Sequence, residues 1–228
     1  MFGLDDKIAA LSAGDAFLIV MAVAVLLGLR HATDPDHLTA VSTLVATGEE
    51  RGPGRAGRLG LAWGFGHATT LFAFGLPIVL ANSYLPETVQ EIAELAVGVM
   101  IVVLAARLLL RWNRGELRVH AHPHAHRPRS ALQAYGIGLV HGVGGSAGVG
   151  VLLLAAIQNQ AEGIAALFVF ALFTAISMSV ASASFGYTLS RGPILSRFVA
   201  VAPVMGTLSM AFGAWYALGA VGALPYVL

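Results

Sequence analysis

Long apolar stretches separated by short polar segments dominate this chain. Windows of about 20 residues, the length needed to cross the hydrocarbon core of a bilayer, predict six membrane-spanning helices. They cover residues 14–46, 57–80, 88–110, 131–157, 163–189 and 198–222. The first stretch is too long for one straight helix and contains Pro35, which lacks a backbone donor and clashes with the preceding turn. We therefore predict an all-α integral membrane protein, one transmembrane domain over residues 1–228, whose first helix is broken at the sequence HATDPDH.

Composition supports the membrane setting and narrows the chemistry. The chain is 57% hydrophobic and 11% charged, whereas a soluble domain carries about 25% charged residues. A formal net charge of +1 argues against a nucleic-acid partner, which usually requires a basic stripe. Cysteine is absent, so a metal ion would be held by nitrogen and oxygen, a donor set that suits nickel, cobalt or zinc.

The polar segments between the predicted helices differ in charge. Segments 47–58, 111–130 and 190–197 carry arginines, whereas segments 81–87 and 158–162 contain no lysine or arginine. By the positive-inside rule the arginine-bearing segments are cytoplasmic. With six crossings, both termini are then expected outside the cytoplasmic (inner) membrane.

The first apolar stretch contains five ionisable side chains within eight residues: Arg30, His31, Asp34, Asp36 and His37. A charge near the bilayer centre costs at least about 2.5–3.5 kcal/mol, so such a cluster must face a cavity, a partner or an ion. Two imidazoles and two carboxylates indicate a metal ion. Arg30 is either a counter-ion to Asp34 or Asp36, the interpretation we favour, or a side chain that extends toward the cytoplasmic surface.

Two further histidines are predicted at the same depth. At about 1.5 Å per residue, His67 and His141 lie roughly 15 Å from the cytoplasmic ends of their helices, and His31 lies roughly 22 Å from the outside. In a continuous helix His31 and His37 would diverge, and a break at Pro35 removes that constraint. The candidate metal residues are therefore His31, Asp34, Asp36, His37, His67 and His141.

Three of the histidines share a local pattern of glycine, apolar, any, histidine, small. It occurs at residues 28–32, 64–68 and 138–142. The first and third copies lie on predicted helices that run in opposite directions, which indicates an inverted repeat of three plus three helices with a binding site near the midplane. Helix packing through small residues is the simpler explanation of the glycines that follow His141.

A second group of histidines lies in the longest cytoplasmic segment, residues 111–130. It comprises His120, His122, His124 and His126. Short histidine-rich tracts bind divalent metals. Three interpretations stay open: an auxiliary site that accepts metal from the inner mouth, a collector that supplies an exporter, or a solvated linker. The aromatic residues Trp63, Trp112, Trp215 and Tyr84 are predicted to include interfacial anchors.

The motif from Arg30 to His37 resembles the second-helix motif of the nickel/cobalt permease (NiCoT) superfamily, because His31, Asp36 and His37 fit its His-x4-Asp-His signature. Residues 65–69 resemble a further motif of that family, and residues 141–146 resemble its shorter urease-accessory (UreH-like) branch. The resemblance implies a carrier for Ni²⁺ or Co²⁺, with His31, Asp36, His37 and His67 as binding and selectivity residues.

We therefore expect a secondary transporter for Ni²⁺ or Co²⁺, with uptake favoured, and neither catalytic residues nor a prosthetic group. Expected partners are the divalent ion, the lipid bilayer and a cytoplasmic metal chaperone or nickel-enzyme maturation protein. The alternatives are an exporter of the same fold, a membrane-bound metalloenzyme, and a channel or metal-sensing scaffold. The sequence contains no His-Glu-x-x-His motif, and tight multidentate binding fits a carrier better than a pore.

Overall fold

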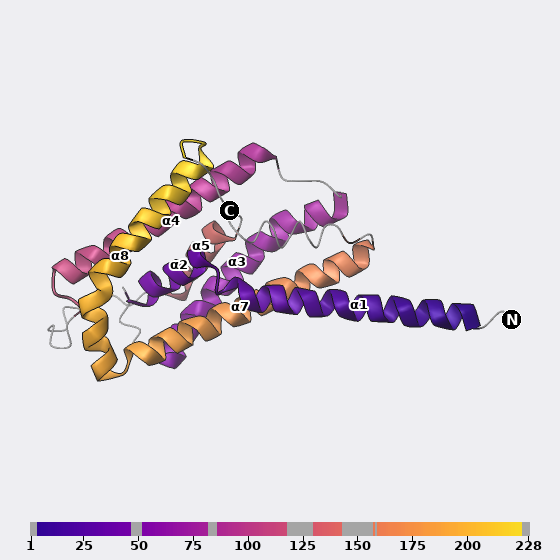
Figure 1. Ribbon diagram of the computed structural model, residues 1–228, viewed down its shortest axis with the longest axis horizontal. Helices are drawn as coiled ribbons and strands as arrows, with labels where there is room; N and C mark the ends of the chain where they lie inside the picture. The colour runs from indigo at the N-terminus through magenta and orange to yellow at the C-terminus, as the bar shows by residue number, and fades with distance from the viewer. Residues whose placement is uncertain are drawn as a thin grey trace.

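The computed structural model describes residues 4–46, 52–81, 86–117, 130–142, 157 and 159–224. Over these residues the secondary structure is helical and contains no strand, as the sequence predicts (Figure 1). The helices are α1 (Leu4–His31), α2 (Pro35–Ala46), α3 (Pro53–Ala81), α4 (Glu87–Asn113), α5 (Ala131–His141), α7 (Gln160–Leu189) and α8 (Gly192–Ala220).

Four described helices are long and apolar enough to cross a membrane by themselves. They are α3, α4, α7 and the part of α8 from Arg197 to Ala220. Residues Phe17–His31 and Pro35–Val41 pass the same test together as a bent pair, which is either one broken span or a re-entrant loop. The chain is therefore a membrane protein. The predicted span 131–157 is described at 131–142 and 157, so the count of six crossings and the inverted repeat stay predictions.

The first helix is broken where the sequence predicts. Helix α1 ends at His31, α2 begins at Pro35, and the two are bent by 48°. Pro35 fits the first position of a helix, because the amide hydrogen that it lacks would have no partner within that helix. The amide of Thr33 donates to the Arg30 carbonyl at 2.8 Å, and the Thr33 hydroxyl donates to the same oxygen at 2.6 Å. The break is therefore a hydrogen-bonded turn that redirects the chain.

Helix α3 occupies the middle of the described bundle. It packs against α7 and α5, while α1 packs against α7 and α4 packs against α8 (Figure 1). The contact between α3 and α5 depends on glycine. A Cβ atom at Gly66 would lie 2.0 Å from the Tyr135 carbonyl oxygen, and one at Gly138 would lie 2.0 Å from the Trp63 carbonyl oxygen. These two glycines allow the helix backbones to touch, as small residues do in membrane proteins.

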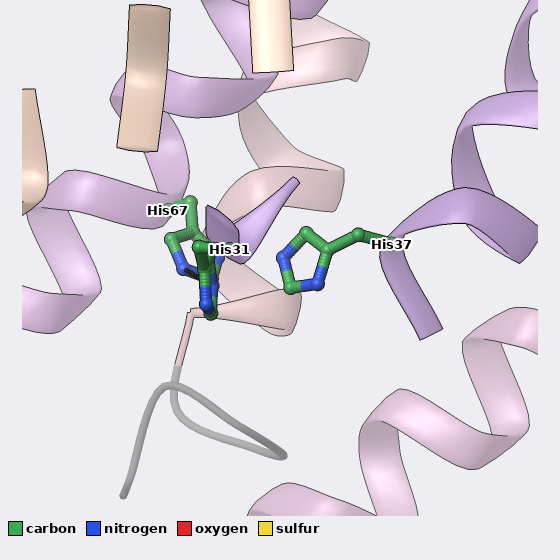
Figure 2. A group of neighbouring side chains, drawn as sticks. All are labelled: His31, His37 and His67. Atoms are coloured by element: carbon green, nitrogen blue, oxygen red, sulfur yellow. Dashed lines mark hydrogen bonds between the residues drawn. The ribbon is translucent and has the colours of Figure 1, made fainter. Parts of the chain in front are cut away.

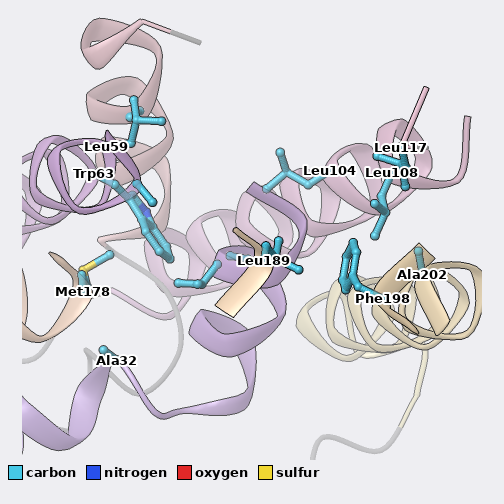
Figure 3. Packing of buried hydrophobic residues seen from close by; sticks show 14 residues of the cluster. Ala32, Leu59, Trp63, Leu104, Leu108, Leu117, Met178, Leu189, Phe198 and Ala202 are labelled. Carbon is cyan, nitrogen blue, oxygen red and sulfur yellow. The ribbon is translucent and has the colours of Figure 1, made fainter. Parts of the chain in front are cut away.

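Two groups of buried apolar residues lie at opposite ends of the helices. The Trp63 cluster (Figure 3) gathers the starts of α3 and α8 and the ends of α4 and α7, which adjoin the arginine-bearing segments. It includes Ala56, Leu59, Trp63, Leu108, Leu117, Leu189 and Phe198. The Phe170 cluster gathers the second half of α3 and the first half of α7, with Leu71, Ile78, Leu167 and Phe170 among its members. The predicted metal residues lie between these two clusters.

Candidate metal site

Four histidines from four helices meet in the interior. His31 ends α1, His37 lies in the first turn of α2, His67 is in the middle of α3, and His141 ends α5. His31 is 3% exposed and the other three are fully buried. The ring centroids of His31 and His37 are 4.2 Å apart, those of His37 and His141 are also 4.2 Å apart, and those of His31 and His67 are 4.8 Å apart. The structure thus brings together the four histidines that the depth argument singled out.

The break at Pro35 brings the rings of His31 and His37 together. Six residues apart on one straight helix, their side chains would point to different sides. The bend turns α2 so that the His37 ring approaches those of His31 and His67 from the opposite side, as Figure 2 shows. The proline therefore has a geometric role in the site although its own side chain is exposed.

A first set of polar contacts runs from Arg30 to His67. A guanidinium nitrogen of Arg30, Nη2, lies 3.1 Å from Oδ1 of Asp34. The other carboxylate oxygen of Asp34 lies 3.6 Å from Nδ1 of His31, and Nε2 of His31 lies 2.9 Å from Nε2 of His67. Asp34 thus lies beside Nδ1 of His31 while Nε2 faces His67, an arrangement common where a carboxylate accompanies a metal-binding histidine. Of the two acids considered for Arg30, the structure pairs it with Asp34.

A second set is centred on Asp36, which is 5% exposed. Its Oδ1 lies 3.1 Å from Nδ1 of His37, and its Oδ2 lies 3.2 Å from Nε2 of His141. One carboxylate therefore joins helices α2 and α5 across 105 residues of sequence. A buried carboxylate with imidazoles on both oxygens also places negative charge beside the cluster, which favours a cation there.

Three ring nitrogens in this cluster are buried and form no hydrogen bond with any described residue. They are Nε2 of His37, Nδ1 of His67 and Nδ1 of His141. Leaving a buried polar atom unpaired costs about 1–3 kcal/mol, so three in one place call for an explanation. A neutral imidazole nitrogen is a preferred ligand for Zn²⁺, Ni²⁺ and related ions. The unpaired atoms are therefore available as donors to a bound cation.

The residues form two groups with metal-ligand spacing. One is His31, His37 and His67, and the other is Asp36, His37 and His141. Within each group, one ligand atom per residue lies within 4.8 Å of the others. Asp34, which the sequence suggested as a ligand, is in neither group and contacts His31 instead, so its part in metal binding stays a prediction.

Two aromatic side chains enclose the cluster. The Trp63 ring lies 5.8 Å from the His37 ring and 5.5 Å from the His141 ring, and the Phe170 ring meets the His31 ring edge-on at 5.7 Å. Trp63 is fully buried, so it is not one of the predicted interfacial anchors. A sequence signal for this position existed, because Trp63 and His67 are four residues apart and share a helix face.

The second histidine group of the sequence, His120 to His126, lies in residues 118–129, outside the described part of the chain. The glycines at 143–148 that follow His141 also lie outside it. The site described above rests on α1, α2, α3 and α5.

The chain aligns with one curated protein, the urease accessory protein UreH of Bacillus sp. (strain TB-90). The two are 28% identical over 209 residues, which cover 87% of this chain and 90% of UreH. The chain resembles UreH over nearly its whole length. This likeness confirms the resemblance to the UreH-like branch that the motifs suggested. No family model matches the chain, and no solved structure matches it.

Proposed function

We propose that this protein is a secondary transporter that carries Ni²⁺ or Co²⁺ across the cytoplasmic membrane, in the direction of uptake. One observation supports this proposal most strongly. The buried histidine cluster at the break between α1 and α2 contains three ring nitrogens that form no hydrogen bond with any described residue. Ionisable groups at this depth in a membrane protein mark ion pathways, because burying them without a partner or an ion is costly.

The donor set supports a first-row divalent ion. The cluster offers imidazole nitrogens and carboxylate oxygens, and these ligands suit nickel, cobalt and zinc. The similarity to urease accessory protein UreH, together with the motifs that resemble those of the nickel/cobalt permeases, favours nickel or cobalt among them. The affinity of these ligands for nickel, cobalt or zinc does not reveal which ion is transported, so a transport measurement must identify it.

The topology that goes with this function has six crossings arranged as two inverted halves, with both termini outside. In that orientation the arginine-bearing segments and the histidine-rich segment face the cytoplasm. An inside-negative potential then drives a divalent cation inward with about 4.6 kcal/mol per 100 mV, twice the value for a single charge. Uptake can therefore be driven by the membrane potential alone, whereas export would have to be coupled to the movement of another ion. The released ion would pass to a cytoplasmic metal chaperone or a nickel-enzyme maturation protein.

The test is uptake of radioactive nickel into proteoliposomes that contain the purified protein, with an imposed inside-negative potential and with cobalt or zinc as competitor. We expect saturable accumulation that disappears in His31→Ala. Leu38→Ala is the matched control, because Leu38 follows His37 on α2 but its side chain is exposed. Nickel that binds without crossing the membrane would favour a sensor or an enzyme, and flux only against a counter-ion gradient would favour an exporter.

A further inference from the structure

We propose that the histidine cluster holds its cation at two overlapping positions in series, which share His37. This inference rests on the proposed transport function and refines it. The first position is formed by His31, His37 and His67, and the second by Asp36, His37 and His141. The ion moves from one to the other without leaving His37.

The ring geometry places His37 in the middle. Its centroid is 4.2 Å from that of His31 on one side and 4.2 Å from that of His141 on the other, where the two rings are stacked at 18°. His31 and His141 do not share a ligand group. Nε2 of His37 is buried and forms no hydrogen bond with a described residue, so this nitrogen is available to a cation. Because the positions share this ligand, they hold one ion at a time.

The surroundings order the two positions along the helices. The first borders the Phe170 cluster, through the contact between His31 and Phe170. The second borders the Trp63 cluster, through the contact between His141 and Trp63. The Trp63 cluster adjoins the arginine-bearing segments, and the Phe170 cluster adjoins the segments without lysine or arginine. In the proposed topology, the first position is therefore the outer one and the second is the inner one.

The two positions differ in charge. The first consists of imidazoles only, whereas the second includes the carboxylate of Asp36. Asp36 contacts both other members of its own group, at 3.1 and 3.2 Å. A cation that arrives among neutral nitrogens is thus drawn toward the carboxylate on the inner side. Two neighbouring positions that each bind the ion with moderate affinity also allow the ion to leave, as movement across the membrane requires.

The test uses Co²⁺ as the probe, because its visible absorption reports the ligands that surround it. The background is the full-length loop-asparagine variant, in which the four histidines outside the described residues are replaced so that they bind no metal: His120→Asn, His122→Asn, His124→Asn and His126→Asn. On this background we compare His31→Asn, His141→Asn and His37→Asn for Co²⁺ affinity, Co²⁺ spectrum and cobalt transport. Asparagine keeps a polar side chain in the buried cluster, and size-exclusion profiles verify that each variant is folded. Any variant that fails this check is remade as the Gln substitution.

We expect His31→Asn and His141→Asn each to retain one Co²⁺ per chain, with different absorption spectra. Transport should fall by at least about tenfold in both, whereas His37→Asn should weaken Co²⁺ binding by about 100-fold or more. Identical spectra in His31→Asn and His141→Asn, or loss of binding as complete as in His37→Asn, would show a single undivided site. Transport at the normal rate in either variant would also overturn the inference. Failure of the unsubstituted protein to bind or carry cobalt and nickel would instead overturn the proposed function itself.

Discussion

Nε2 of His31 and Nε2 of His67 lie 2.9 Å apart, although 36 residues separate them in the chain. One ring must donate a hydrogen to the other at this distance, because two unprotonated nitrogens repel each other. A cation that binds both nitrogens displaces that hydrogen. This contact between the end of α1 and the middle of α3 is therefore coupled to metal binding.

Removal of one side of this contact should weaken metal binding without unfolding the protein. We expect His67→Ala to lower nickel affinity by at least about tenfold, which is about 1.4 kcal/mol of binding free energy. Isothermal titration calorimetry on the loop-asparagine variant measures the change. Thr69→Ala is the matched control on α3, since Thr69 is exposed and its hydroxyl bonds, among the described residues, the Phe65 carbonyl and Tyr135. An unchanged affinity in His67→Ala would remove His67 from the site.

Asp34 should act on the metal through His31. Asp34→Asn removes the negative charge that lies 3.6 Å from Nδ1 of His31 and 3.1 Å from Arg30. Loss of such a supporting carboxylate typically lowers metal affinity about 10–100-fold, so we expect a decrease in this range with one nickel still bound per chain. The same titration shows whether this holds. Loss of all binding would mean that Asp34 is itself a ligand, and no change would mean that it has no role in orienting His31.

The close contact between α3 and α5 should be the most sensitive packing point near the site. Gly66→Ala and Gly138→Ala each introduce a Cβ atom 2.0 Å from a backbone oxygen of the other helix. Overpacking usually costs about 1–3 kcal/mol, so both variants should unfold at lower temperature in detergent. Gly136→Ala is the control, because it lies on the same helix α5 and a Cβ atom there meets nothing within 4 Å. Equal stability of all three variants would contradict the described packing.

Acid should weaken metal binding. Imidazole binds a metal ion through the lone pair that also accepts a proton, so each histidine ligand must be neutral. Protons therefore compete with nickel as the pH falls, and nickel affinity should rise with pH until the ligands are deprotonated. Titrations of the loop-asparagine variant at several pH values, with proton release followed in weak buffer, measure this dependence. Binding that is independent of pH and releases no proton would show that the histidines are not ligands.

The sequence predicted the depth of the site but not its contacts. Counting residues from the ends of the helices placed His31, His67 and His141 at one level, and Pro35 predicted the break that turns His37 toward them. Depth is a single coordinate, however, and does not say which way a side chain points around its helix. That rotation depends on the contact of Gly66 and Gly138, which joins segments about 70 residues apart in the chain.

The sequence does not predict which distant residues contact each other, because it does not show which way each side chain points. Asp36 and His141 are 105 residues apart, and nothing local to either one marks them as neighbours. The sequence places Trp63 among the candidate interfacial anchors together with the other tryptophans. Composition alone does not distinguish a buried indole ring that packs against two histidines from one at the membrane surface. Only the structure reveals the contact between Asp34 and His31. In the sequence, Asp34 is three residues from both His31 and His37, a spacing that suits a metal ligand equally well.

X-ray absorption at the nickel edge of the nickel-loaded loop-asparagine variant counts the imidazoles around the ion and so shows whether the buried histidines bind it. We expect at least two imidazole ligands together with other nitrogen or oxygen donors, no sulfur, and loss of the imidazole signal in His37→Ala. A nickel ion without imidazole ligands, or an imidazole signal that His37→Ala leaves unchanged, would show that the metal is bound outside the buried cluster.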